Sequence, residues 1–311
     1  MEIGDVMDQL NPHGEWRLDA ARQIAHRLRN LAGLRAIVVA GSVARGYADE
    51  YSDLELPLFW DEPPSDATRH AIIHTLQADL LHPYNGPAQE DNLLINGFQV
   101  DLWQNTVAFE EDTLNAVLQR YSTDLGASNF MDTVRSCIPL AGDELIATWK
   151  QRASAYPEPL AVRNIQEQLP HLEIGHLMIH AARDNPALVY ASISELQQYL
   201  FLILLALNHT YFPGPKWLYR SIEALPIKPI QAARRMKQVF HLAQAQAVDE
   251  TINLLREALA LVERYHPQIN TTPTRLALEP QRMAHPAPVR LYQDDDAVSC
   301  QGFCKDRENV R

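Results

Sequence analysis

The sequence predicts an α+β protein in which an N-terminal mixed-sheet domain precedes a C-terminal all-helical bundle domain. Short β-branched runs and a hairpin signal are confined to about the first hundred residues. From about residue 106 onward no convincing strand is found, and proline-separated segments carry apolar residues at helical spacing. The composition, 46% hydrophobic and 21% charged, is typical of a folded chain. We therefore expect domains at 1–125 and 126–269, followed by a loosely ordered tail at 270–311.

The N-terminal elements follow from periodicity and turn chemistry. In the first helix, Ala21, Ile24 and Leu28 recur at intervals of three and four residues. Asn96-Gly97 lies between two apolar runs and is a strong signal for a two-residue hairpin turn. In chain order we expect a helix, a strand, a short helix, a strand, a longer helix and a hairpin, over residues 14–31, 36–40, 43–45, 52–60, 67–81 and 93–103.

The C-terminal elements are all expected to be helices, and we expect the long one at 157–183 to bend at Pro170. The longest apolar run, near 200–207, is well short of the ~20 residues needed to cross a bilayer, so it predicts a buried helix and no membrane partner. The expected helices cover residues 106–121, 129–138, 142–155, 157–183, 187–207, 216–225, 229–243 and 248–265.

The stretch between the first two strands is the most informative part of the chain. Gly41 permits a sharp turn and a close approach of a ligand, and Ser42 is placed to cap the helix that follows. Backbone N–H groups at such a turn suit a phosphate. Asp53 and Glu55 are two residues apart in a strand, so their carboxylates point to the same face. Two neighbouring carboxylates are tolerable when a divalent cation lies between them.

A third carboxylate is expected on a neighbouring strand. Asp101 lies in the second arm of the predicted hairpin, between two apolar residues. If that arm pairs with the strand of Asp53 and Glu55, the three carboxylates converge. Oxygen ligands of this kind suit Mg²⁺, which keeps some of its waters and takes further oxygens from a substrate triphosphate.

Taken together, these patterns resemble the signature of the DNA polymerase β-like nucleotidyltransferase superfamily. The family pattern is Gly-Ser, a short helix, Asp-x-Asp/Glu and a later single acid, and the resemblance covers about residues 34–105. It implies an N-terminal nucleotidyltransferase catalytic domain that moves a nucleoside monophosphate, most often AMP from ATP, from a nucleoside triphosphate to a hydroxyl acceptor. The matching residues are Gly41-Ser42, Ser52-Asp53-x-Glu55 and Asp101.

The resemblance also implies roles for individual residues. Asp53, Glu55 and Asp101 are expected to hold two Mg²⁺ ions, with Mn²⁺ as an alternative, and Asp101 to help deprotonate the acceptor hydroxyl. Gly41 and Ser42 are expected at the terminal phosphates of the nucleotide. Two further residues, Arg45 and Ser52, match positions that contact the triphosphate in relatives, although Arg45 could instead pair with Asp49 or Glu50 at the surface.

One basic residue outside this region is a further candidate. Lys216 follows Pro213-Gly214-Pro215, which fixes a turn, and opens the next helix beside Trp217. A cation at a rigid bend near the domain junction could reach the triphosphate or the acceptor. The alternative is an exposed lysine at a helix start.

The acceptor and the partners are less constrained by the sequence. The chain is similar to bacterial transferases that place AMP on small hydroxylated acceptors, including aminoglycoside and lincosamide resistance enzymes. Transfer of AMP to a protein hydroxyl, as in toxin–antitoxin-type relatives, and a non-catalytic nucleotide-binding or interaction module are the alternatives. The net charge of −12 argues against a tight grip on long nucleic acid. The sequence leaves undecided whether the protein forms a homodimer.

The three cysteines, Cys137, Cys300 and Cys304, form neither a zinc pattern nor a disulfide framework. The acidic N-terminus lacks a basic region followed by an apolar run, so no signal peptide is expected. Both observations favour a cytoplasmic protein.

Overall fold

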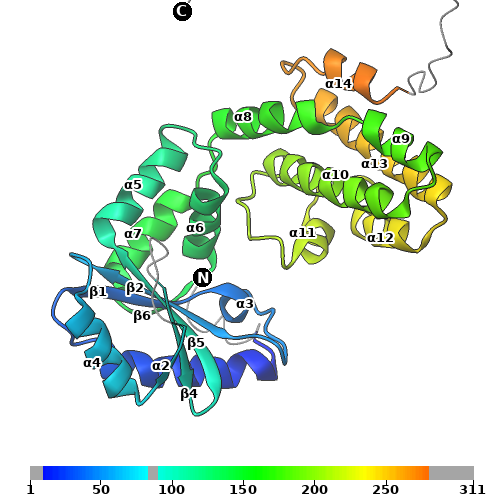
Figure 1. The fold of residues 1–311 in the computed structure, drawn as a ribbon. Coiled ribbons are helices and arrows are strands. Elements are labelled where there is room, and N and C mark those ends of the chain that lie inside the picture. The colour runs from blue at the N-terminus through cyan, green and yellow to red at the C-terminus, as the bar shows by residue number, and fades with distance from the viewer. Residues whose placement is uncertain (1–9, 83–89, 280–311) are drawn as a thin grey trace, which may run out of the picture.

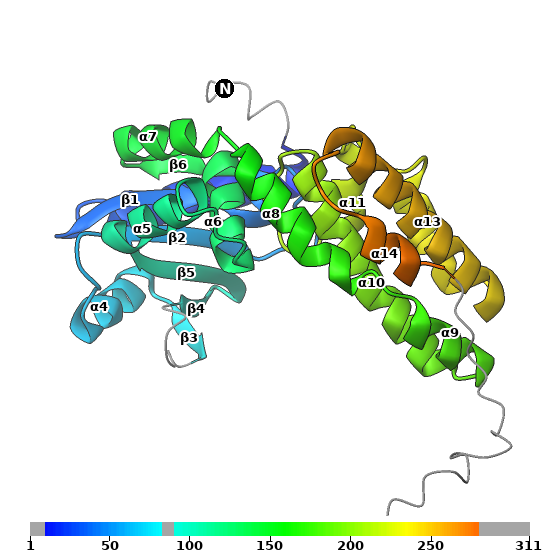
Figure 2. The same cartoon turned by 90° about the horizontal axis from the view of Figure 1, so that it is seen from above.

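The computed structural model describes residues 10–82 and 90–279. It confirms the α+β class: a mixed sheet with helices on both faces is joined, through helix α8, to a region made of helices (Figures 1 and 2). Helix α8 spans Glu158–Gln168 and runs from one region into the other, so the two regions lie side by side rather than stacked.

The sheet has six strands in the order β3-β4-β5-β2-β1-β6. The pair β2 and β5 is parallel, and the other neighbouring pairs are antiparallel. The predicted Asn96-Gly97 hairpin joins β4 to β5, and the second arm of that hairpin lies beside β2. The strands are β1 (Leu34–Val39), β2 (Leu54–Trp60), β3 (Asp79–His82), β4 (Glu90–Ile95), β5 (Phe98–Thr106) and β6 (Ile138–Ala141).

Two apolar layers cover the two faces of the sheet. Alternate residues of β2, Leu54, Leu56 and Leu58, are buried with the core of helices α2 and α4. Phe59 points to the opposite face, where Phe130 and Trp149 pack edge-on against it. The helices around the sheet are α2 (Pro12–Leu28), α3 (Gly41–Ala44), α4 (Asp66–Leu76), α5 (Val107–Leu118), α6 (Leu125–Ser136) and α7 (Asp143–Ala153).

The remaining helices form a second core around α10, which spans Pro186–Leu207. This helix is long and apolar enough, by length and composition, to cross a membrane, but half of its most apolar window is buried and a core helix passes the same test. Its end at 200–207 is almost wholly buried, as predicted. The others are α9 (Gly175–Ala182), α11 (Leu218–Ala224), α12 (Ala232–Gln238), α13 (Gln244–Tyr265) and α14 (Thr272–Ala277), with short 3₁₀ turns at Leu169–His171 and Val239–His241.

The sheet region extends further along the chain than the expected boundary at residue 125. Strand β6 pairs with β1, with Pro139 opposite Val38, so a strand follows residue 106 after all. A four-residue strand with an internal proline gives little sequence signal, and proline is tolerated because β6 is the edge of the sheet. Helices α6 and α7 therefore pack on the sheet, and the change to the helical region comes after residue 153.

Three other expectations need correction. The helix predicted at 67–81 ends at Leu76, because Gln77 adopts a left-handed conformation, and strand β3 follows. The helix expected at 157–183 is not one bent helix but two, separated by a 3₁₀ turn that contains Pro170. Residues 270–279 do not belong to a loosely ordered tail as expected, because α14 forms there and Thr274 donates a hydrogen bond to the carbonyl of Leu169. The tail cysteines Cys300 and Cys304 lie outside the described residues.

Candidate active site

A cleft of about 530 Å³ lies where the start of β2 faces the segment before α11. Its walls come from four stretches that are far apart in the sequence, which is why only the folded chain brings them together. The lining residues are Ser42, Arg45, Asp49, Tyr51, Ser52, Asp53, Glu55, Trp103, Asn129, Thr133 and 213–217.

The Gly41 turn packs directly against one of the predicted carboxylates. Gly41 has a φ of +62°, and a Cβ added to it would overlap the carboxylate of Glu55. Both the backbone conformation and the close contact therefore require glycine. Ser42 lines the cleft, but it does not cap the short helix α3 as expected, because the N-cap residue is Ala40.

We expect Gly41→Ala to impair ligand binding more than folding. The left-handed backbone costs about 1–2 kcal/mol for a non-glycine residue, and the new methyl group displaces the Glu55 carboxylate. Gly33→Ala is the matched control, since Gly33 has a φ of +80° with nothing within 4 Å of an added Cβ. Denaturant unfolding should show similar losses for both variants, whereas binding of the nucleotide that the sequence leads us to expect should fall only for Gly41→Ala. Equal binding by the two variants would show that the contact between Gly41 and the Glu55 carboxylate does not shape a ligand site.

The predicted carboxylates lie on one face of the sheet. In the parallel pair, Glu55 is directly opposite Asp101, and neighbouring strands are about 4.8 Å apart. Asp53 immediately precedes β2. The apolar residues Leu54 and Val100 point to the α2 and α4 side, so the acids face the side where α5, α6 and α7 lie. Near Phe59 those helices cover this face, whereas at the start of β2 it opens into the cleft.

Glu55 is the most strongly perturbed of the cleft carboxylates. Burial raises its pKa, the negative charge of Asp53 raises it further, and Lys216 and Arg45 act in the opposite direction. Within the described residues, neither the Asp53 nor the Glu55 carboxylate takes part in a hydrogen bond or an ion pair. Two adjacent carboxylates without a direct ion-pair partner form a site that favours a bound cation.

Asp101 has a different environment. It is 6% exposed and does not line the cleft. Its carboxylate accepts a hydrogen bond from the Asn92 amide at 2.9 Å and two from the Gln99 amide at 3.1 and 3.2 Å. Glu90, near Asn92, is a fourth acid, whose pKa is raised by burial and then by Asp101. Among the described residues, no group of three His, Cys, Asp or Glu side chains is already arranged around a metal position.

A buried arginine, not identified from the sequence, holds the loop that leads into Asp53. Arg17 is 2% exposed, and its Nε and one of its terminal nitrogens donate to the carbonyl of Ser52 at 3.0 and 2.6 Å. Burial lowers its pKa, while Asp49 and Asp53 act to raise it. The Ser52 hydroxyl itself donates to Asp49 at 2.9 Å. The available signal was the position of Arg17 on the otherwise apolar face of its helix, four residues before Ala21.

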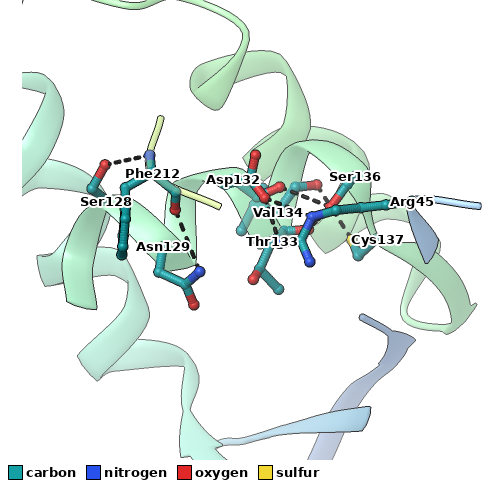
Figure 3. A network of polar contacts seen from close by, with 9 residues as sticks. All are labelled: Arg45, Ser128, Asn129, Asp132, Thr133, Val134, Ser136, Cys137 and Phe212. Atoms are coloured by element: carbon teal, nitrogen blue, oxygen red, sulfur yellow. Dashed lines mark hydrogen bonds and ion pairs between the residues drawn. The ribbon is translucent and has the colours of Figure 1, made fainter. Parts of the chain in front are cut away.

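Arg45 pairs with a partner on α6, not with Asp49 or Glu50. Its Nε donates to the Asp132 carboxylate at 2.9 Å, and a second guanidinium nitrogen bonds to the same oxygen (Figure 3). The same helix binds the segment before α11: Asn129 donates to the Phe212 carbonyl at 3.3 Å, and the Phe212 N–H donates to Ser128 at 2.9 Å. Helix α6 therefore connects the Gly41 turn to the opposite wall of the cleft.

Lys216 lies on that opposite wall, close enough to lower the pKa of Glu55. Within the part of the chain that the structure describes, its ammonium group makes no hydrogen bond or ion pair. Next to it the two regions touch: Trp217 packs edge-on against Tyr47 at 5.6 Å, and Arg220 lies 3.7 Å from the centre of the Tyr47 ring. These contacts hold the segment that carries Lys216 against Tyr47, which follows α3 in the sequence.

The chain is similar to a family model and to a solved structure. A family model described as a domain of unknown function (DUF4037) matches residues 128–218, which include the α6 wall and Lys216 but not the carboxylates. No curated protein matches the chain. A crystal structure of a nucleotidyltransferase-like protein from Exiguobacterium sibiricum 255-15 is similar at 11% identity and a TM-score of 0.39, covering 79% of this chain and 77% of that one. At this identity and TM-score, the likeness supports no particular activity.

Proposed function

We propose that this protein is a nucleotidyltransferase that binds a nucleoside triphosphate in the cleft and moves its nucleoside monophosphate to a hydroxyl acceptor. The observation that carries the proposal is the pair of carboxylates of Asp53 and Glu55, which line the cleft without an ion-pair partner among the described residues. Glu55 packs against the Gly41 turn, and Lys216 lines the same cleft. The motif resemblance over residues 34–105 leads to the same reaction.

The donor set fits Mg²⁺. This ion is usually bound by one or two carboxylates and completes its shell with water and substrate phosphate oxygens. Asp53 and Glu55 would supply those two carboxylates, and we propose Asp101 as the third. Its carboxylate would then bind the ion in place of the hydrogen bonds that it now accepts from the amides of Asn92 and Gln99. When bound, the metal neutralises phosphate charge and polarises the reacting phosphorus centre.

The side chains of the cleft divide into those that bind the triphosphate and those that hold the walls. Arg45 and Ser52 are already engaged, with Asp132 and Asp49 respectively, so we propose that they mainly maintain the shape of the site. Ser42 and Lys216 are available to the phosphates: the hydroxyl of Ser42 donates a hydrogen bond, and the ammonium group of Lys216 offsets negative charge.

The reaction balances without a further reactant. The acceptor oxygen forms a bond to the α-phosphorus of the triphosphate as the bond to the β-phosphate oxygen breaks, and pyrophosphate leaves. The acceptor hydroxyl proton passes to a carboxylate of the site and then to solvent; we propose Asp101 for this step. Positioning and charge stabilisation supply most of the catalysis in such a displacement.

The test is transfer of label from nucleoside triphosphates carrying a radioactive α-phosphate. Each of the four triphosphates is incubated with the protein, Mg²⁺ and a panel of hydroxylated small molecules, including aminoglycosides, and separately with proteins. Label on a small molecule supports the proposal, and label on protein supports transfer to a protein hydroxyl. Triphosphate binding without transfer to any acceptor would instead indicate a non-catalytic nucleotide-binding module.

A further inference from the structure

A second hollow adjoins the candidate active site. It has a volume of about 950 Å³, lies along α11 and α12, and shares Lys216 and Trp217 with the first cleft. We call it the basic groove. It is lined by Lys216, Trp217, Tyr219, Arg220, Glu223, Ala233, Arg234, Lys237, Gln238 and His241.

The charge of the basic groove is opposite to that of the chain. Four Lys and Arg side chains line it against one carboxylate, although the protein carries a net charge of −12. Within the described residues, none of the four is ion-paired. Arg235, the neighbour of Arg234, shows the contrast, since it is bonded to Glu250 and Glu257. The unpaired cations are therefore a property of the groove and not of α12 as a whole.

Aromatic rings, not acids, support two of these cations. The Lys237 ammonium lies 5.2 Å from the centre of the Tyr219 ring, and the Arg220 guanidinium lies 3.7 Å from that of Tyr47. A ring face attracts a cation without neutralising it, so the positive charge stays available to a ligand. Arg234 and Lys237 are three residues apart on α12, where like charges repel each other by a few tenths of a kcal/mol. A bound anion removes that repulsion.

We propose that the basic groove binds the acceptor, and that the acceptor is a small hydroxylated compound carrying phosphate. Arg234 and Lys237 hold the phosphate, while the hydroxyl reaches past Lys216 to the carboxylates of the cleft. This inference rests on the proposed function and specifies its hydroxyl acceptor as an anionic compound. A small compound suits a chain whose overall negative charge disfavours long nucleic acid.

The binding test uses fructose 1,6-bisphosphate as the probe and fructose as its uncharged counterpart, with binding measured by calorimetry at physiological salt. The wild-type protein should bind the bisphosphate and not fructose. The double variant Arg234→Glu/Lys237→Glu should bind it about tenfold or more weakly, because two charge-assisted contacts become repulsive. Arg264→Glu is the matched control, an exposed cation on α13 outside the groove, and should bind like the wild type. The neutral double variant Arg234→Gln/Lys237→Gln should lose less bisphosphate affinity than the Glu variant. It serves as a second variant in case the two introduced carboxylates disturb the fold.

A transfer assay separates this inference from the proposed function. Labelled triphosphate is offered with a pool of cellular small molecules, either untreated or treated with phosphatase. Transfer to the untreated pool alone, lost in the double variant while Mg²⁺–ATP binding is kept, supports both proposals. Equal transfer to both pools would overturn the proposal that the basic groove binds a phosphorylated acceptor. Equal binding of the bisphosphate by the double variant and the wild type would overturn it as well. If the double variant loses bisphosphate binding but neither it nor the wild type transfers label, the result supports the groove as an anion-binding site and contradicts the proposed reaction.

Discussion

Asp53→Asn is expected to lower kcat for the proposed nucleotidyl transfer by about a thousandfold or more, since it removes one of the two cleft carboxylates that we propose as metal ligands. The fold should be unaffected, because Asp53 makes no hydrogen bond or ion pair within the described residues. Thermal unfolding should give an unchanged or slightly raised midpoint, as the like-charge repulsion with Glu55 disappears.

The control for this variant is Glu50→Gln, which makes the same change of charge at an exposed position of the same loop. It should retain wild-type kcat. A second readout does not depend on turnover: removing the Asp53 charge should lower the pKa of Glu55, which titrations followed by carboxyl NMR signals can detect. If Asp53→Asn kept wild-type turnover, the proposal that Asp53 and Glu55 form the catalytic metal site would be wrong.

The pKa of Glu55 predicts how Mg²⁺-dependent nucleotide binding changes with pH. Because burial and Asp53 raise the pKa of Glu55, the ligand form of that carboxylate is reached at a higher pH than usual. Mg²⁺-dependent nucleotide binding should therefore rise as the pH rises through that pKa, and Asp53→Asn should move the transition to lower pH.

Local chemistry made much of the carboxylate face predictable. Alternation along the extended chain from Asp53 into β2 predicted that Asp53 and Glu55 lie on one side, and the Asn96-Gly97 turn located the arm that carries Asp101. That this arm pairs with β2 in register, Glu55 opposite Asp101, was a condition of the sequence-based hypothesis, and the structure fulfils it. The amides that hold Asp101 were not foreseen, since hydrogen bonds within a sheet face depend on register and on rotamers that no sequence pattern records.

Features that depend on distant contacts could not be predicted. Arg45 is 87 residues from Asp132, and no charge pattern along the chain links the two. The assignment of α6 to the helical domain followed from the absence of a strand signal in 138–141, so the helix that ties both walls of the cleft was placed on the wrong side of the boundary. The basic groove forms only where α11 packs beside α12 in the folded chain, so no local sequence pattern predicts it.

Glu110→Gln is expected to stabilise the protein at alkaline pH by up to about 5 kcal/mol. Glu110 lies in the first turn of α5, is 2% exposed, and accepts a hydrogen bond from the Asn105 amide at 2.5 Å. Burial raises its pKa to about 8, and the Asn105 hydrogen bond lowers it only in part. Glutamine keeps the acceptor oxygen and removes the charge.

The sign follows from proton binding in the two states. Between pH ~4.5 and ~8 the unfolded chain has released the Glu110 proton while the folded protein retains it, so this residue makes stability fall by up to about 1.4 kcal/mol per pH unit as pH rises. Below this window both states are protonated, and above it both are ionised. The free energy of unfolding of Glu110→Gln, measured in denaturant, should therefore exceed the wild-type value increasingly from pH 5 to pH 8.5.

The adjacent Glu111 provides the opposite case. Burial acts to raise its pKa, but hydrogen bonds from Arg152 and Trp149 outweigh that effect, so the pKa is lowered. Glu111→Gln should therefore reduce stability at pH 7, with the difference from wild type shrinking as the pH falls through the lowered pKa. If both glutamine variants changed stability in the same direction at pH 8.5, the assignment of a raised pKa to Glu110 beside a lowered pKa for Glu111 would be wrong.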